Sequence, residues 1–385
     1  MHVMKTDIRT ANIIEEGRYA GPQVRILGVA ERLKAEGIKT LVICPEEESE
    51  HFYTKAVKRK VEICRIPMHR LSRNPTSIFR YFITFPKEVY FLYRMVKKEN
   101  IDIVHCNSIR QLKGVVAGWF ARKKVIWHLQ DTRNNIIIRA FFFTASFLVD
   151  YFIAAGERVR EYYLRRFPLS HKPVKIIQAP VNTYLFDPNL VSADQRIESS
   201  PGVKVVSVGN INPAKAYQYL IKAASYLNLK NNEVSFWIVG PVFESQQLYY
   251  SKLIKLSQKL NVKNVNFYGK ANNVRAILKG ADIYVCSSIH EASPISIWEA
   301  MSMGRAIIST DVGDVNRFIK NGVNGFIVPI QNPKALANKI NILLNAPELR
   351  NLFGQRSRLT AIQHLDVSIC VRKHAEAYRE LLNND

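Results

Sequence analysis

The sequence predicts an α/β protein with two Rossmann-like domains. Short runs rich in β-branched residues alternate with helical patterns, and this alternation occurs twice along the chain. Strands that alternate with helices form parallel sheets covered by helices on both faces. A chain of 385 residues, 47% of them hydrophobic, is long enough to build two cores of ordinary size.

The first alternation occupies residues 1–181, which we expect to form an N-terminal, acceptor-binding domain. Its first helical pattern, at 24–37, has apolar residues at helical spacing and stops at Gly37, because glycine commonly ends helices. The strand-like runs are IRTANII, KTLVIC, VEICRI, DIVHC, KVIWHL, DYFIAA and VKIIQ.

Residues 182–202 lose apolar periodicity, so we expect a linker there. The alternation restarts at 203, and residues 203–363 are expected to form a C-terminal, donor-binding domain. Helical patterns at 332–345 and 347–383 close the sequence, and we expect the helix within 364–385 to pack back toward the first domain. The strand-like runs of this half are VKVVSVG, VSFWIVG, VNFYG, DIYVCS, RAIIST and GFIVP.

Cysteine usage and hydropathy indicate a cytoplasmic protein. The five cysteines show no C-x-x-C and no metal-ligand spacing, which is typical of reduced, buried thiols. The N-terminus lacks the apolar segment of a signal peptide. The longest uncharged apolar stretch, at 140–149, has roughly half the length that a membrane-spanning helix needs.

The net charge of +23 is concentrated in the first half of the chain. Residues 51–140 hold nineteen Lys and Arg against five Asp and Glu, an excess of +14, and aromatic residues are interleaved with the cations at 77–98. No nucleic-acid-binding motif accompanies this charge, so we expect no nucleic acid partner. Alternating aromatics and cations favour an anionic membrane surface, and a merely solvated basic face is the alternative.

Polar residues that follow strands are candidates for a binding site, because parallel sheets bind ligands at the carboxyl ends of their strands. Lys215 follows VKVVSVG near a helix start, where a cation is unusual unless an anion lies beside it. Segment 290–304, HEASPISIWEAMSMG, has Glu291 in a loop and Glu299 at the start of a helix. Helix starts attract phosphate, and carboxylates accept hydrogen bonds from sugar hydroxyls. The pattern therefore predicts a sugar-phosphate ligand, with exposed glutamates and a solvated lysine as the alternative.

Two further candidates follow strands of the first half. In the loop EEGRYAGPQ, Gly17 and Gly21 allow the backbone to approach a ligand before the helix at Pro22. His128 ends a strand that is otherwise apolar, and its alternative is a structural role. With two such domains facing each other, we expect the ligand in the cleft between them.

These segments together resemble the retaining glycosyltransferases of family 4, which have the GT-B fold of two Rossmann-like domains facing across a cleft. The resemblance covers almost the whole sequence and is strongest at 203–345. The family's pattern of two glutamates separated by seven residues matches Glu291 and Glu299. The other matching segments are ADIYVCSSIHEASPISIWEAMSMGRAIISTDVGDV, NGVNGFIVP, VGNINPAKAYQYLIKA and AGPQVRILGVAERLKAEGIKTLVICP.

The resemblance implies a catalytic set of three residues. Glu291 would bind hydroxyls of the donor sugar, Lys215 would neutralise the leaving diphosphate, and His128 would contact the sugar near the reacting carbon. The expected donor-binding residues are Gly21, Asn210, Lys215, Glu291, Ile295, Ser296 and Glu299.

The donor-binding roles also come from the resemblance. Glu299 would accept hydrogen bonds from the ribose, and the backbone amides of Ile295 and Ser296 would hold the distal phosphate. The loop at Gly21 would approach the diphosphate. The sequence has no D-x-D motif, so we expect no metal, and positive charge from Lys215 would replace it. We expect no cofactor; the donor substrate is a nucleotide-diphosphate sugar, taken as a UDP-sugar, with GDP left open.

The expected enzyme is a retaining, metal-independent hexosyltransferase on the inner face of the membrane. Its acceptor would be a lipid-linked glycan or an oligosaccharide or polysaccharide, in exopolysaccharide, O-antigen or capsule synthesis. Asn210 stands where the family usually has arginine, and Ala216 and Ala292 stand in place of glycines. One alternative is therefore a catalytically weakened GT-B sugar-nucleotide-binding or membrane scaffold. A second alternative is another GT-B enzyme, such as a sugar-nucleotide epimerase.

Overall fold

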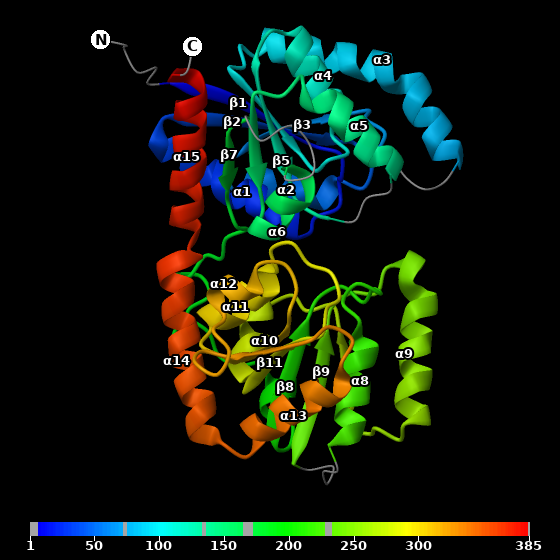
Figure 1. The fold of residues 1–385 in the computed structure, drawn as a ribbon, viewed down its shortest axis with the longest axis vertical. Coiled ribbons are helices and arrows are strands. Elements are labelled where there is room, and N and C mark those ends of the chain that lie inside the picture. The colour runs from blue at the N-terminus through cyan, green and yellow to red at the C-terminus, as the bar shows by residue number, and fades with distance from the viewer. Residues whose placement is uncertain (1–6, 72–74, 133–135, 165–171, 228–232, 384–385) are drawn as a thin grey trace. The chain divides into compact units, whose positions relative to one another are not determined.

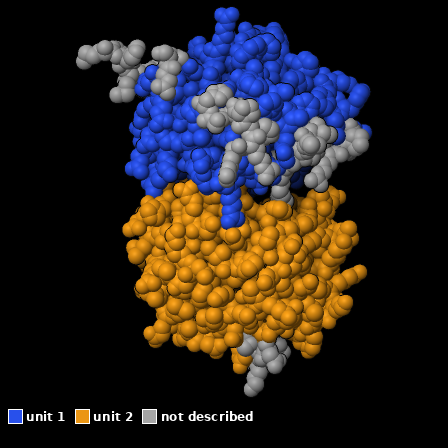
Figure 2. Space-filling model, in the orientation of Figure 1, with its two compact units in different colours: residues 1–179, 367–385 blue, residues 180–366 orange. Residues whose placement is uncertain are grey.

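The computed structural model describes residues 7–71, 75–132, 136–164, 172–227 and 233–383. The chain forms two compact units, one of residues Met1–Ala179 with Val367–Asp385 and one of residues Pro180–Asp366 (Figure 2). Each unit contains one parallel β-sheet with helices packed against it. The prediction of an α/β protein with two Rossmann-like domains is confirmed.

The sheet of the first unit has seven strands in the order β3-β2-β1-β4-β5-β6-β7. The strand order reverses between β1 and β4, so the carboxyl ends of these strands lie at the point where such sheets bind ligands. The strands are β1 (Ile8–Ile14), β2 (Ile38–Pro45), β3 (Glu62–Ile66), β4 (Ile103–Asn107), β5 (Lys124–Leu129), β6 (Tyr151–Ala154) and β7 (Val174–Ile176). The helices are α1 (Gly21–Leu33), η1 (Lys34–Glu36), α2 (Glu50–Lys58), α3 (Pro75–Lys98), α4 (Leu112–Phe120), α5 (Ile136–Ser146), α6 (Glu157–Leu164) and α15 (Val367–Asn383).

The sheet of the second unit has six strands in the order β10-β9-β8-β11-β12-β13. Its strand order reverses between β8 and β11, which places the loops after these two strands at the ligand-binding edge. The strands are β8 (Val203–Val208), β9 (Val234–Val239), β10 (Val265–Gly269), β11 (Ile283–Cys286), β12 (Ala306–Thr310) and β13 (Phe326–Val328). The helices are α7 (Gln195–Glu198), α8 (Tyr217–Tyr226), η2 (Glu244–Gln246), α9 (Gln247–Lys259), α10 (Val274–Gly280), α11 (Ile295–Ser302), α12 (Val315–Phe318), α13 (Pro333–Leu344) and α14 (Pro347–His364).

The first helix is one turn longer at its start than its apolar pattern predicts. Helix α1 begins at Gly21 and continues as the 3₁₀ turn η1, which ends at Gly37. Gly37 has a left-handed backbone with φ of 74°, a conformation in which glycine is free of the Cβ clash. The glycine therefore ends the helix at the predicted residue.

The segment 182–202, expected as a linker, lies within the second unit. It contains the short helix α7, whose N-cap is Asp194. The Asp194 carboxylate accepts hydrogen bonds from the amides of Arg196 and Ile197, and the Ile197 side chain is fully buried. This segment has too few apolar residues to show a period, yet one of them anchors it.

The helical pattern at 347–383 is two helices, α14 and α15, separated at residues 365–366. Asp366 pairs with Val181 as an isolated bridge and accepts hydrogen bonds from the Thr183 amide and hydroxyl. Helix α15 packs against α1 (Figure 1) and shares an apolar core with β1, β4 and β5, through residues such as Val371, Ala375 and Tyr378. The end of the chain therefore completes the first unit.

No helix in the described part of the chain combines the length and the hydropathy needed to cross a bilayer.

Candidate functional site

Lys215 lies in the loop between β8 and α8, at the ligand-binding edge of the second sheet. The side-chain oxygen of Asn212 accepts hydrogen bonds from the amides of Ala214 and Lys215 and so closes the turn before the helix. Ala216, at the N-cap of α8, has a left-handed backbone with φ of 52°. This conformation gives a physical reason for the glycine that the resembled family usually has here, since alanine adopts it at a cost of roughly 1–2 kcal/mol.

Lys215 and Glu291 form an ion pair, with 2.7 Å between Nζ and Oε1. The same carboxylate oxygen accepts a hydrogen bond of 2.9 Å from the Ser288 hydroxyl. Burial lowers the pKa of Lys215, but the Glu291 carboxylate raises it by a larger amount, so the pKa lies above the usual value. The site therefore holds a permanently charged lysine beside a carboxylate.

Two further contacts join the loops that carry Lys215 and Glu291, and a third ties the loop of Glu291 to β12. The Ile289 amide donates to the Ala214 carbonyl at 2.9 Å, and the Ser287 hydroxyl donates to the Lys215 carbonyl at 3.0 Å. The Thr310 hydroxyl, from the end of β12, donates to the Ser288 carbonyl at 2.6 Å. Sequence reasoning missed Ser287, Ser288 and Thr310, although each is a hydroxyl residue at the end of a predicted strand.

Gly209, the residue after β8, lets the Lys215 side chain pass directly over the backbone. A Cβ atom at position 209 would lie 2.6 Å from Cε and 3.1 Å from Nζ of Lys215. The Tyr217 hydroxyl donates to the Gly209 carbonyl at 2.8 Å, so the backbone has little freedom to withdraw. Any side chain at position 209 therefore displaces the lysine.

We expect Gly209→Ala to lower kcat/KM for sugar transfer by up to about 100-fold, because displacing a catalytic group by about 1 Å has effects of that order. Donor-dependent turnover and melting temperature of the purified variant would measure this. Gly28→Ala is the matched control, since a Cβ at that helical position meets its nearest neighbour, Arg59, only at 4.0 Å. Unchanged kcat/KM in Gly209→Ala would show that the position of Lys215 is not critical.

Helix α11 begins at Ile295 and carries the remaining predicted residues of the second unit. Its N-cap is Pro294, whose side chain has no hydrogen-bond acceptor, and the first amides of a helix have no partner within it. The helix is fixed from its other face, where Ile297 and Trp298 are fully buried. The amides of Ile295 and Ser296 are thus free of helical and capping partners, as a phosphate site needs.

Glu299 lies on α11 and is partly buried. Burial raises its pKa from 4.5 to about 8, an effect that the nearby Lys215 partly offsets. Between these two pH values the folded state keeps a proton that the unfolded state has lost. The free energy of unfolding therefore falls as pH rises from about 4.5 to about 8.

We expect Glu299→Gln to raise the melting temperature more at about pH 9 than at about pH 5, with a difference of at least about 2 °C, because the amide never has to ionise. Differential scanning fluorimetry of the ligand-free protein at both pH values would measure it. Glu348→Gln, at an exposed position on α14, is the control for the charge change. An increase of equal size at both pH values would contradict the raised pKa.

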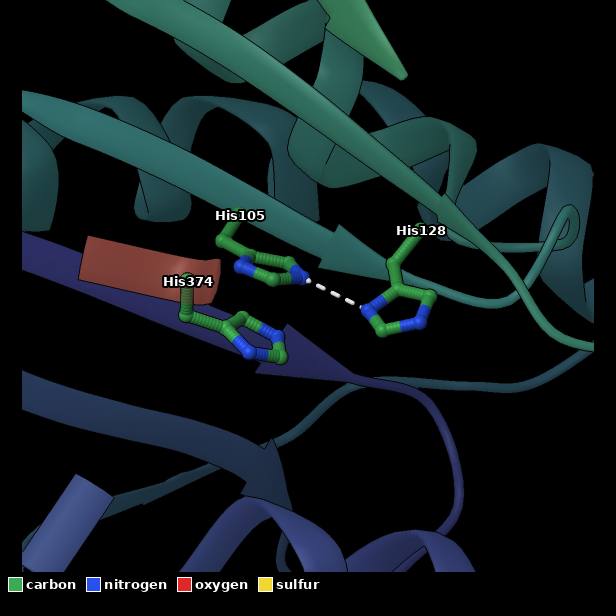
Figure 3. A group of neighbouring side chains, drawn as sticks. All are labelled: His105, His128 and His374. Carbon is green, nitrogen blue, oxygen red and sulfur yellow. Dashed lines mark hydrogen bonds between the residues drawn. The ribbon is translucent and has the colours of Figure 1, made fainter. Parts of the chain in front are cut away.

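In the first unit, His128 lies at the carboxyl end of β5 and is 1% exposed. Its Nδ1 is 3.1 Å from Nη1 of Arg25 and 3.2 Å from Nε2 of His105. His374, from α15, lies beside both histidines (Figure 3). Burial lowers the pKa of His128 and His105 well below the usual value, and the Arg25 charge adds to this, so both rings are neutral.

One ring nitrogen from each of these three histidines lies within 4.8 Å of the other two, a spacing that could hold a metal ion. The guanidinium of Arg25, however, occupies the Nδ1 of His128 and repels any cation placed there. The arrangement fits neutral, hydrogen-bonded rings better than a metal centre.

Gly21 is the first residue of α1, next to the N-cap Ala20. The Gln23 side chain holds this start: its oxygen accepts from the Ala20 amide at 3.1 Å, and its nitrogen donates to the Glu16 carbonyl at 2.7 Å. At Gly17 a Cβ would lie 2.2 Å from the Glu47 carbonyl oxygen. Gly17 thus serves close packing against a neighbouring loop.

The predicted residues divide between the two units. Lys215 and Glu291 are in direct contact, and Asn210 follows Gly209 in the same loop as Lys215. Their binding and catalytic roles remain predictions. The residues of the second unit are Asn210, Lys215, Glu291, Ile295, Ser296 and Glu299, and those of the first are Gly21 and His128.

Two family models match this sequence. "Glycosyltransferase Family 4" matches residues 19–185, and "Glycosyl transferases group 1" matches residues 193–360. Together the two matches span most of the chain. The chain is 23% identical to UDP-Gal:alpha-D-GlcNAc-diphosphoundecaprenol alpha-1,3-galactosyltransferase of Escherichia coli, over 77% of its own length and 80% of the relative's.

A second relative is matched over nearly its whole length. N,N'-diacetylbacillosaminyl-diphospho-undecaprenol alpha-1,3-N-acetylgalactosaminyltransferase of Campylobacter jejuni is 22% identical, over 92% of this chain and 95% of that protein. Among solved structures, a glycosyltransferase from Rickettsia africae superposes with a TM-score of 0.83 at 20% identity, covering 98% of this chain and 100% of that one. Anabaena Alr3699/HepE in complex with UDP-glucose superposes with a TM-score of 0.80 at 17% identity, covering 97% and 100%.

Proposed function

The chain belongs to the glycosyltransferases that these two family models describe, and from this we propose a retaining hexosyltransferase that uses a UDP-sugar and needs no metal. The observation that carries the proposal is the ion pair of Lys215 and Glu291 beside the free amides of α11. A cation and helix amides suit a diphosphate, and a carboxylate suits sugar hydroxyls.

In the proposed reaction the bond between the anomeric carbon and the diphosphate oxygen breaks first. Negative charge develops on the departing phosphate, and Lys215 with the amides of Ile295 and Ser296 stabilises it, which is the work that a metal does in other transferases. The acceptor hydroxyl then bonds to the anomeric carbon on the face that the phosphate leaves, and its proton passes to the phosphate oxygen. Positioning of the substrates and stabilisation of the leaving group account for the rate enhancement.

The donor and acceptor classes rest on the similar proteins. The Anabaena structure contains UDP-glucose, and the Escherichia coli relative is named for UDP-galactose. Both curated relatives are named for acceptors linked to diphosphoundecaprenol. We infer a lipid-linked acceptor in cell-surface glycan synthesis, at the inner face of a membrane.

A thermal-shift panel of UDP, GDP and ADP sugars would test the proposed donor. We expect a UDP-sugar to raise the melting temperature, because ligand at about a hundred times its dissociation constant stabilises a protein by about 2.7 kcal/mol. The increase should be lost in Lys215→Ala and kept in Lys255→Ala, an exposed position on α9. A shift with GDP-sugars alone would mean that the donor is a GDP-sugar and not a UDP-sugar. No shift with any nucleotide sugar would contradict the proposed site.

The membrane part of the proposal rests on an aromatic face of the first unit. Helices α3, α4 and α5 lie side by side (Figure 1), and each exposes large apolar side chains. Phe79 is 69% exposed and Ile83 is 62% exposed, while Tyr81 of the same helix lies in the core at 2%. We define the aromatic face as Ile78, Phe79, Phe82, Ile83, Tyr90, Phe91, Trp119, Phe120, Phe141 and Phe147.

The aromatic face is flanked by exposed cations. Helix α3 exposes Arg80, Lys87, Arg94, Lys97 and Lys98. Exposed apolar patches on this scale mark interaction surfaces, and rings with neighbouring cations suit the headgroup region of an anionic bilayer. We propose that this face holds the enzyme on the membrane that carries its acceptor.

A further inference from the structure

A chain of hydrogen bonds connects the last helix to the strand end that carries His128. The Tyr378 hydroxyl, on α15, is 2.7 Å from Nδ1 of His105, on β4. Nε2 of His105 is 3.2 Å from Nδ1 of His128, on β5 (Figure 3), and that Nδ1 also faces Nη1 of Arg25 at 3.1 Å. Tyr378 and His105 are fully buried, and Arg25 is 6% exposed.

Arg25 fixes the direction of every hydrogen bond in this series. An arginine guanidinium can only donate, so Nδ1 of His128 must accept and carries no hydrogen. The contact from Nε2 of His105 to the same Nδ1 must then be a donation as well. Nδ1 of His105 consequently accepts, and the Tyr378 hydroxyl donates to it.

The outcome is one defined tautomer of His128. A neutral imidazole with a bare Nδ1 carries its hydrogen on Nε2. This Nε2 is buried and has no hydrogen-bond partner among the residues that the structure describes. A buried N–H without a partner costs free energy, and a ligand acceptor recovers it.

We propose that Arg25, His105 and Tyr378 are positioning residues that hold His128 as the Nε2–H tautomer, so that the ring offers a single donor to an oxygen of the donor substrate. The identity of that substrate rests on the proposed function; the tautomer does not. Asn107, at the end of β4, accepts a hydrogen bond from Nη2 of Arg25 and so orients the guanidinium. His374 stacks on His105 and donates from Nδ1 to the Cys370 carbonyl at 2.8 Å, so its Nδ1 is not an acceptor for the other two histidines.

Nitrogen NMR of the full chain with isotope-labelled histidine would test the tautomer without any substrate. We expect one signal pair, absent in His128→Gln, with a protonated Nε2 and an unprotonated Nδ1. A protonated Nδ1, a charged ring or stoichiometric zinc on the purified protein would overturn the proposal. This readout holds whether or not the protein transfers sugar, so it separates the two hypotheses.

Donor hydrolysis with UDP-glucose or UDP-galactose, whichever raises the melting temperature, would test positioning. We expect His105→Phe to lower kcat about 10-fold to 100-fold, the effect that loss of an orienting partner has for metal-binding histidines, with KM much less changed. His105→Gln, whose amide can both donate and accept, should restore part of the loss, and Tyr378→Phe should give a smaller decrease.

Tyr151→Phe is the matched control for Tyr378→Phe. The Tyr151 hydroxyl donates to Glu380 of α15 at 2.9 Å, so the control also removes one tyrosine hydrogen bond to this helix but leaves the histidine chain intact. Equal losses of kcat in the two tyrosine variants would mean that Tyr378 has only a structural role. Normal kcat in His105→Phe, with the His128 signals unchanged, would overturn the positioning role.

Discussion

Lys215→Ala and Glu291→Gln should each lower kcat/KM for sugar transfer by about 10²–10³, the usual effect of removing one preorganised electrostatic group from a transition state. In the proposed reaction, Lys215 would be the cation for the leaving diphosphate, and Glu291 would accept hydrogen bonds from the sugar hydroxyls. The glutamine keeps the hydrogen bonds of Glu291 to Lys215 and Ser288 but removes its charge. Steady-state kinetics with the donor found by thermal shift would measure both variants.

The ion pair also predicts that the effects of the two substitutions on kcat/KM are not independent. Because the side chains are in contact at 2.7 Å, the double variant should lose much less than the product of the two single effects. Lys255→Ala is the control for loss of a lysine, and melting temperatures would exclude unfolding. Near-normal kcat/KM in either single variant would mean that the site is assigned wrongly.

The second large effect concerns membrane binding. We expect the wild-type protein to sediment with anionic vesicles and much less with neutral ones, with the bound fraction decreasing as salt rises. The double substitution Phe79→Ser with Ile83→Ser should weaken partitioning at least about tenfold, because burial of each side chain contributes up to about 1.5–3 kcal/mol. Both side chains are more than 60% exposed, so the fold should tolerate the change.

Leu248→Ser is the matched control for the membrane experiment. Leu248 is 72% exposed on α9 of the second unit, far in sequence from the aromatic face, and its loss should leave vesicle binding unchanged. If the wild-type protein remains in the supernatant with both kinds of vesicle, the membrane proposal is wrong and a soluble acceptor becomes the better hypothesis.

Most strands can be located from the sequence because they are largely buried and therefore form short runs of mainly apolar residues, as β2, β9 and β11 do. Each of the thirteen predicted runs overlaps one of the strands β1 to β13. Elements held by single contacts are harder to predict. The break between α14 and α15 depends on Asp366 reaching Thr183, a contact across 183 residues of sequence that no local period reveals.

In the candidate site, too, residues with local sequence signals could be predicted, and contacts that depend on the folded structure could not. Lys215, Glu291 and Glu299 were predictable because strand ends and a helix start are local signals. The close approach at Gly209 was not, since it depends on the path of the Lys215 side chain. The link from Tyr378 to His105 was not either, because the two residues are 273 positions apart and meet only after the last helix joins the first unit.

The discontinuity of the first unit has a consequence for synthesis on the ribosome. Its sheet emerges early, but the apolar surface formed by residues such as Ile8, Ile103 and Ile126 stays uncovered until Val367–Asp385 has been made. The second unit, Pro180–Asp366, is continuous and can fold as it emerges. The domain that is translated first is therefore completed last, and a ribosome that stops shortly before the end leaves a chain with a folded second unit and an incomplete, aggregation-prone first unit.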